Sequence, residues 1–222
     1  MTIILLLVAT LATIALWWLS HQRLMEKPWL ETGPAEAFRG VTAGGMPAEK
    51  IALGVFLAVV SSLFALFASA YSMRMHMASD WRSLPLPWLL WPNTIVLFLS
   101  SLAMGWAQIA VRRGDAASLR KALLAGGASA FLFLVGQLMA WQQLAEGGFY
   151  LAANPANAFF YLLTALHGLH LLGGLVAWGR TIVRTGRSTA ARWMTLSVDL
   201  CALYWHFMLL VWLAILALLL HG

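Results

Sequence analysis

Residues 159–174, FFYLLTALHGLHLLGG, place two histidines, His167 and His170, three residues apart in an otherwise apolar stretch. A later apolar stretch adds His206 and, seven residues before it, Asp199. Ionisable groups are costly inside hydrocarbon, so one that lies within a membrane span is usually paired or functional. Three imidazoles and one carboxylate in two neighbouring spans therefore mark this region as the candidate functional site.

The composition identifies an integral membrane protein, because 62% of the residues are hydrophobic and only 10% are charged. An ordinary soluble domain has about 25% charged residues. Strand-like alternation is absent, and helices are the other way to satisfy the backbone in lipid. The fold class that we predict is all-α, a polytopic transmembrane bundle of six helices. The six apolar stretches of membrane-spanning length are residues 2–20, 51–72, 88–111, 122–145, 157–179 and 195–220.

The positive charges are distributed unevenly between the two sides of this arrangement. Of the fourteen Lys and Arg residues, only Arg74 and Arg82 lie on the side of the termini, and the other twelve lie in the loops at 21–50, 112–121 and 180–194. Basic loops stay on the cytoplasmic side. We therefore predict that both termini are periplasmic. The net charge of +6 then reflects topology, and nucleic acid is not an expected partner.

Two parts are predicted along the chain. Residues 1–50 form a transmembrane helix followed by a connector rich in Pro, Gly and Glu, and residues 51–222 form a five-helix bundle. The N-terminal stretch lacks a basic start and a clear cleavage site. It is therefore predicted to be a retained helix and not a cleaved signal peptide.

The histidines and the aspartate admit several functions. They could transfer protons, bind haem, or connect helices through hydrogen bonds worth about 0.6–2 kcal/mol each in membranes. His167 and His170 cannot approach one haem iron from opposite sides, whereas His170 with His206 could. Cys201 is the only cysteine, so thiolate-bridged copper and iron–sulfur sites lack ligands, and we expect no metal site.

At the level of motifs, the chain resembles subunit III of the haem–copper oxidases, the family of cytochrome c oxidase and the related quinol oxidases. The two-histidine stretch is similar to that family's signature, and the likeness continues through Asp199–Trp212, NTIVLFLSSLAMGWA at 93–107 and Gln137. It covers about residues 51–222. The expected polar network comprises His167, His170, Asp199, His206 and Gln137. The residues expected to pack helices together are Asn93, Trp106, Thr164, Gly168, Tyr204, Trp205 and Trp212.

The resemblance implies a non-catalytic core subunit with no active site of its own. Haem and copper would lie in partner subunits I and II, and this chain would stabilise the catalytic subunit of a proton-pumping oxidase in a bacterial inner membrane and bind phospholipid. Alternatives are an accessory subunit of a nitric oxide reductase or a quinol oxidase. A b-type haem membrane protein and a proton-coupled transporter are alternatives of another class.

Three positions depart from the pattern of the family. Val60, Ala140 and Leu209 stand where its members commonly carry acidic residues. These changes argue against direct proton transfer by this chain. They leave the packing role intact, because a buried acid also has a desolvation cost.

Overall fold

The computed structural model describes residues 47–77, 81–185 and 191–221. Five helices account for most of these residues, and each is long and apolar enough to cross a membrane. Their bounds are α2 Ala48–Met77, α3 Leu90–Arg112, α4 Ala116–Glu146, α5 Pro155–Thr185 and α6 Ala191–His221. The prediction of an all-helical, multi-pass chain is confirmed for this part. The predicted helix at residues 2–20 lies outside the described residues.

Four of the helices extend beyond the apolar stretches that predicted them. The clearest case is α4, which begins at Ala116 and not at residue 122. The hydropathy of a segment marks only the part that crosses the hydrocarbon. A helix continues into its polar flanking turns as long as its backbone hydrogen bonds and its caps are satisfied.

The chain divides into two compact units, Met1–Phe56 and Leu57–Gly222. In the first unit the structure describes residues 47–56, which contain the opening turns of α2. The second unit contains the rest of α2 and the helices α3 to α6. The candidate site residues all lie in this second unit.

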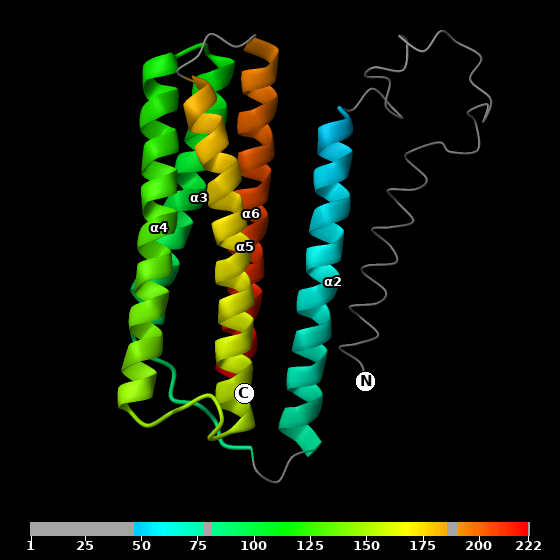
Figure 1. Cartoon of the computed structure of the whole chain (residues 1–222), viewed down its shortest axis with the longest axis vertical. Helices are drawn as coiled ribbons and strands as arrows, with labels where there is room; N and C mark the ends of the chain where they lie inside the picture. The colour runs from blue at the N-terminus through cyan, green and yellow to red at the C-terminus, as the bar shows by residue number, and fades with distance from the viewer. Residues whose placement is uncertain (1–46, 78–80, 186–190, 222) are drawn as a thin grey trace, which may run out of the picture. The chain divides into compact units, whose positions relative to one another are not determined.

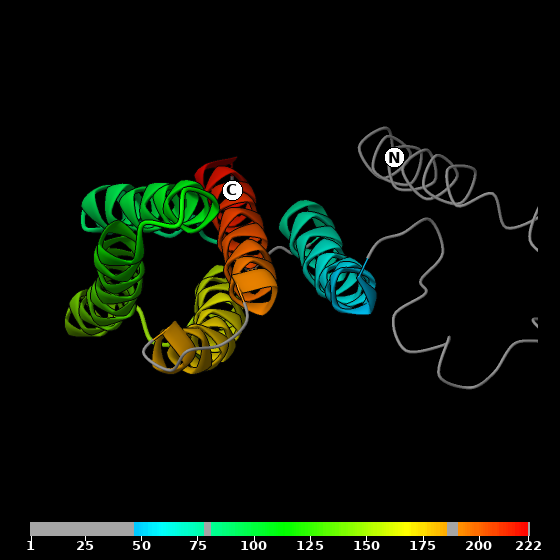
Figure 2. The same ribbon diagram turned by 90° about the horizontal axis from the view of Figure 1, so that it is seen from above.

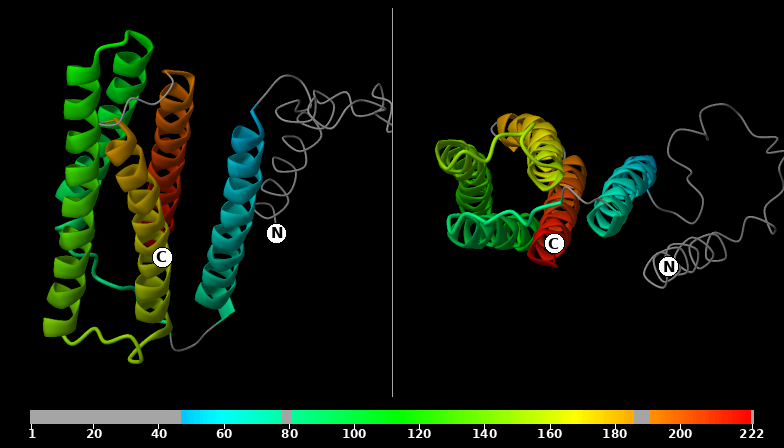
Figure 3. Two further views of the ribbon diagram at one scale, coloured as in Figure 1. Left: turned by 45° about the horizontal axis from the view of Figure 1, so that its top comes forward. Right: turned by 90° about the horizontal axis from the view of Figure 1, so that it is seen from below.

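Helices α3 to α6 form a closed four-helix arrangement in which consecutive helices run in opposite directions (Figures 1 and 2). In it, α3 packs against α4 and α6, and α5 packs against the same two helices. Two further views show the same arrangement (Figure 3). The largest fully buried side chains of the second unit include Trp205, Trp212, Phe133, Phe160 and Leu97. Because lipid tails are as apolar as these side chains, the bundle depends on close packing and on hydrogen bonds between helices.

Small residues allow α3 and α4 to approach closely. A Cβ added to Gly126 would lie 2.9 Å from Met104 Cε, and the Ser100 hydroxyl donates a 2.6 Å hydrogen bond to the carbonyl of Gly126. Ala130, one turn further along α4, is fully buried. The small residues at Gly126 and Ala130 therefore lie at a helix contact, as their spacing in the sequence indicates.

The start of α4 is fixed by a side-chain cap. Gly114 has φ +70°, a left-handed conformation that glycine adopts readily, and it turns the chain between α3 and α4. The Asp115 carboxylate then accepts a 3.0 Å hydrogen bond from the backbone N–H of Ser118. Hydrogen bonds from the Ser118 hydroxyl and backbone N–H lower the pKa of Asp115 below its ordinary value.

Replacing Asp115 by alanine is expected to lower the thermal stability of the protein at neutral pH, because the N-terminal amides of α4 lose their acceptor. The lowered pKa means that this contribution is complete above the pKa of the unfolded carboxyl and is lost as the pH falls through the folded pKa. Thermal unfolding in mild detergent at neutral and acidic pH measures both effects. Asp115→Asn, which caps without titrating, is the control. A difference between wild type and Asp115→Ala that stays constant with pH would contradict this account.

Candidate functional site

His167 lies inside the bundle, with 0% of its surface exposed. Its Nε2 is 3.1 Å from the carbonyl oxygen of Met208 on α6. A carbonyl can only accept, so Nε2 carries the proton and donates it. The ring also packs edge-on against Phe133, at 5.5 Å between centroids, and lies 5.1 Å from the ring of Trp212. One side chain of α5 therefore contacts both α4 and α6.

His170, one turn further along α5, has different neighbours. Its Nδ1–H donates a 2.7 Å hydrogen bond to the carbonyl of Leu166 in its own helix. The Tyr204 hydroxyl on α6 donates a 2.7 Å hydrogen bond to the backbone carbonyl of His170. The His170 ring also lies 5.6 Å from the ring of Phe64. The two histidines of the motif thus contact different partners.

His206 connects α6 to α3. Its Nδ1 is 2.6 Å from the hydroxyl oxygen of Ser101, within hydrogen-bonding distance. A Cβ added to Gly105, one turn beyond Ser101, would lie 3.8 Å from the His206 ring. The small residues at 101 and 105 therefore make room for the imidazole on the surface of α3.

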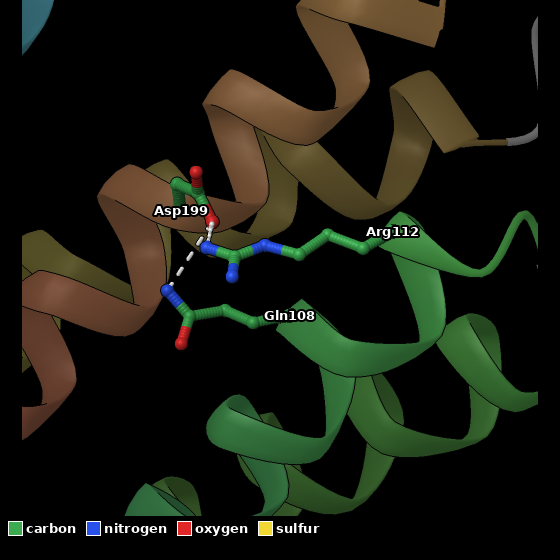
Figure 4. A network of polar contacts seen from close by, with 3 residues as sticks. All are labelled: Gln108, Arg112 and Asp199. Carbon is green, nitrogen blue, oxygen red and sulfur yellow. Dashed lines mark hydrogen bonds and ion pairs between the residues drawn. The ribbon is translucent and has the colours of Figure 1, made fainter.

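Asp199 meets the far end of α3. Its carboxylate accepts a 3.3 Å hydrogen bond from Gln108 Nε2 and a 3.2 Å bond from Arg112 Nη2 (Figure 4). The aspartate side chain is 14% exposed, whereas that of Arg112 is 64% exposed. Ion pairs with an exposed partner are worth about 0–1 kcal/mol. This group therefore fixes the mutual position of two helices more than it stabilises them.

Asp199 and His206 both contact α3, in agreement with the shared helix face that their seven-residue spacing predicts. His167 contacts α4 and the backbone of α6, and His170 contacts residues of α2 and α6. The four side chains thus connect helices at different levels of the bundle. A single polar network that joins all four of them stays a prediction.

Several of the motif residues also form hydrogen bonds between helices. The indole N–H of Trp205 donates to the Ser100 hydroxyl at 2.9 Å, and that hydroxyl donates to the carbonyl of Gly126. A continuous chain of bonds therefore runs from α6 through α3 to α4. All three residues are on buried faces of their helices.

Three further polar contacts involve motif residues. The Trp212 indole donates to Thr94 Oγ1 at 2.9 Å. The Asn93 amide donates to the carbonyl of Phe133 at 3.1 Å. Thr164 Oγ1 accepts a 3.1 Å bond from the indole of Trp141. These bonds connect α6 to α3, α3 to α4, and α4 to α5.

The remaining predicted residues differ from this pattern. Gly168 faces Leu134, where an added Cβ would be in ordinary contact at 3.5 Å. Trp106 is 46% exposed, so within this chain its ring is only partly covered. Gln137 is only 3% exposed, and neither atom of its amide has a hydrogen-bond partner among the residues that the structure describes.

Sequence reasoning missed most of the acceptors and donors on α3. Gln108 and Arg112 are not among the predicted site residues, although Ser101, Gly105, Gln108 and Arg112 follow a 4-3-4 spacing. Residues with this spacing share one face of a helix. The pattern could therefore have indicated a polar stripe facing α6. The indole of Trp178 donates to the carbonyl of Leu123 at 2.8 Å, and no spacing pattern in the sequence indicates this contact.

Within the described ranges 47–77, 81–185 and 191–221, no group of three or more His, Cys, Asp or Glu side chains could hold a metal ion. Cys201 is buried and lies 3.4 Å from the hydroxyl of Thr181. Thr181 of α5 and Cys201 of α6 therefore form a further polar contact between helices.

Replacing His167 by phenylalanine is expected to lower the free energy of unfolding by roughly 1–2 kcal/mol, because a buried hydrogen bond between α5 and α6 is lost. Reversible unfolding of the purified protein in mixed micelles measures the difference. The control is the same substitution at His76, which is exposed at the end of α2 and should change stability little. Equal effects at the two positions would show that the bond to Met208 contributes nothing.

Comparison with known proteins identifies the family. The family model described as cytochrome c oxidase subunit III matches residues 1–221, which is more than the residues 51–222 that carry the resemblance in motifs. A relative from Mycobacterium tuberculosis strain H37Rv, named "Probable cytochrome c oxidase subunit 3", is 32% identical over 68% of this chain and 75% of its own length. "Cytochrome c oxidase subunit 3" of Synechocystis is 32% identical over 72% of this chain and 70% of its own length. The corresponding protein of Thermostichus vulcanus is 28% identical over 76% of this chain and 85% of its own length. The chain, a multi-pass membrane protein whose helices are connected through the histidine motifs, therefore belongs to the cytochrome c oxidase subunit III family of the haem–copper oxidases.

Proposed function

We propose that the chain is a non-catalytic core subunit that packs beside subunits I and II of a proton-pumping cytochrome c oxidase and stabilises the catalytic subunit. Membership of the family implies a complex with other oxidase subunits. The observation that carries the proposal is that residues of the family motifs form hydrogen bonds between helices. His167, Trp205 and Trp212 each form hydrogen bonds to a neighbouring helix, an arrangement suited to a rigid surface against which a partner can pack.

A stripe of large apolar side chains on α3 supports the interface with a partner. Its members are between 46% and 61% exposed in this chain, and their 4-3-4-3 spacing puts them on one face of the helix. The stripe also contains Trp106 of the family motif, so a motif residue would be buried by a partner helix and not within this chain. The residues of this stripe are Ile95, Leu99, Leu102, Trp106 and Ile109.

Bound phospholipid is part of the proposal. A groove of about 800 Å³ lies between the end of α4 and the start of α5, and its lining includes Trp141, Leu151, Tyr161 and Leu162. An apolar groove at the membrane-facing surface suits an acyl chain. Replacing Ala165, which also lines the groove, by phenylalanine should reduce the lipid that co-purifies with the complex. Unchanged lipid, measured by mass spectrometry, would count against this site.

Direct proton transfer through this chain is not part of the proposal. Val60, Ala140 and Leu209, at the positions where the family commonly has acids, are 2%, 0% and 8% exposed. Apolar side chains at buried positions need no proton and no partner. The chain is therefore expected to act on proton uptake only through the stability of its partners.

The proposed location is a bacterial inner membrane, with both termini on the periplasmic side. The distribution of Lys and Arg carries this orientation. Labelling of single cysteines introduced at Ala117 and Glu146, which are exposed at opposite ends of α4, tests it in intact cells. A Cys201→Ala background removes the native thiol. Labelling at position 146 and not at position 117 is the expected result.

Co-purification from native membranes tests the function. A tagged chain, extracted in mild detergent, is expected to recover a large haem-bearing subunit and a copper-bearing partner, which mass spectrometry identifies. Recovery of subunits of a nitric oxide reductase or a quinol oxidase would indicate that the chain is an accessory subunit of that enzyme instead. Recovery of the folded chain alone would overturn it, and a reduced-minus-oxidised spectrum of that chain would then test for a haem protein.

Replacing His170 by phenylalanine is expected to loosen the subunit or its attachment to the complex, because the imidazole loses its hydrogen bond to the Leu166 carbonyl and changes its ring contact with Phe64 of α2. Haem signals of the complex should remain, since no haem is assigned to this chain. Yield of the subunit in the pull-down and thermal stability of the complex measure the effect. Full assembly with unchanged stability would contradict it.

A further inference from the structure

We propose that the four-helix bundle binds a water molecule between Gln137 of α4 and His167 of α5. Both side chains are buried, at 3% and 0% exposed. Both also carry polar atoms that have no hydrogen-bond partner in the described part of the chain: the two amide atoms of Gln137 and Nδ1 of His167. Buried polar groups in proteins are nearly always paired with protein or with ordered water, so two unsatisfied groups on adjacent helices indicate a shared ligand.

The register of α4 and α5 puts the two residues at one level. Leu134 of α4 lies opposite Gly168 of α5, where an added Cβ would be 3.5 Å from the leucine. Trp141 of α4 donates a hydrogen bond to Thr164 of α5. Gln137 lies between Leu134 and Trp141 on one antiparallel helix. It therefore faces the turn from Thr164 to Gly168 on the other helix, and His167 belongs to that turn.

The neighbours of both side chains place them on the same buried face. Phe133, one turn before Gln137 on α4, packs its ring against His167 at 5.5 Å between centroids. Trp141, one turn after Gln137, packs against Tyr161 of α5 at 5.7 Å. Gln137 is thus enclosed along α4 by two residues that contact α5, and the four-residue spacing puts it on the same face of the helix.

The protonation of the histidine specifies what the ligand must do. Nε2 donates its proton to the Met208 carbonyl, so in the neutral ring Nδ1 is a bare acceptor. The ligand must therefore donate a hydrogen bond to Nδ1. Gln137 does not do so directly, because the Gln137 amide and His167 Nδ1 are not hydrogen-bonded to each other. Water can donate to Nδ1 and bond to the Gln137 amide at the same time.

The chemistry of the surroundings favours water over an ion. The two unpaired groups are neutral, and among the described residues no cluster of three His, Cys, Asp or Glu could hold a metal. Buried waters typically form about three hydrogen bonds to groups that would otherwise be unsatisfied. In hydrocarbon, lipid offers no donor or acceptor in place of that water.

A cryo-electron-microscopy map of the intact oxidase in lipid nanodiscs, at a resolution that shows ordered water, tests the proposal. The expected result is one water density within about 3.2 Å of both His167 Nδ1 and the Gln137 amide. A direct hydrogen bond between the two side chains would overturn the proposal. So would two well-ordered side chains with no density between them.

A matched pair of variants independently tests whether Gln137 helps to bind the proposed water molecule. Gln137→Met keeps the side chain unbranched and removes its polar atoms, and the water density beside His167 should disappear while the contact of His167 with Met208 remains. Gln142→Met, exposed on the same helix, should leave the density unchanged. Persistence of the density in Gln137→Met would overturn the role of Gln137. If that variant fails to assemble, the wild-type map decides the question alone.

Discussion

Replacing Gly127 by alanine is expected to lower the free energy of unfolding by roughly 3 kcal/mol, since overpacking costs about 1–3 kcal/mol and a lost buried bond a similar amount. An added Cβ at this position would overlap the indole of Trp178 on α5. That indole is rigid, and its N–H donates a 2.8 Å hydrogen bond to the carbonyl of Leu123. The ring therefore cannot move aside without breaking the bond that joins α5 to α4.

Unfolding of the purified protein in mixed micelles measures this loss. Gly173→Ala is the matched control, because a Cβ there meets nothing within 4 Å and alanine favours a helix by about 1 kcal/mol. Adding Trp178→Leu to Gly127→Ala should recover part of the stability by removing the clash. Equal stability of Gly127→Ala and Gly173→Ala would refute the close approach of α4 and α5 at this level.

Replacing Trp212 by alanine is expected to cost about 3 kcal/mol, the lower end of the range for such truncations in soluble cores, because lipid solvates apolar groups well and only packing and hydrogen bonding are lost. Trp212 is 1% exposed. Its ring lies 4.9 Å from Phe133 and 5.1 Å from His167 between centroids, and its N–H donates to Thr94. The substitution therefore removes contacts to three other helices at once.

Two companion variants separate these contributions. Trp212→Phe keeps most of the ring contacts and loses the bond to Thr94, so it should cost about 1 kcal/mol. Trp88→Ala, at a position 68% exposed before α3, should change stability little. The same micelle unfolding experiment compares all three. A loss at Trp88 as large as that at Trp212 would show that the aromatic cluster around His167 is not a centre of packing.

Much of the fold could be predicted without the structure. The spans at 51–72, 88–111, 122–145, 157–179 and 195–220 each correspond to one of the five helices. Hydropathy is sufficient for this because every backbone polar group in lipid must be satisfied within its own segment. The two histidine motifs likewise indicated the family, which the match over residues 1–221 shows.

The partners of the site residues could not be predicted in the same way. The spacing of Asp199 and His206 predicts that they share one face of their helix. It does not predict that their partners on α3 are Gln108 and Ser101. These pairs are separated by 91 and 105 residues. Such contacts depend on the rotation of each helix about its axis and on the register between helices.

The sequence by itself determined that this protein crosses the membrane as helices and which five stretches of the described residues do so, because the cost of an unpaired backbone in lipid leaves few alternatives. Its histidine motifs indicated the family. The tertiary structure alone decided that His167 contacts Met208, that Trp178 lies over Gly127, and that Trp141 donates to Thr164. Side chains of similar polarity can pair in many ways along a helix. Only close packing between helices, which depends on the shapes of all the residues at once, selects one of them.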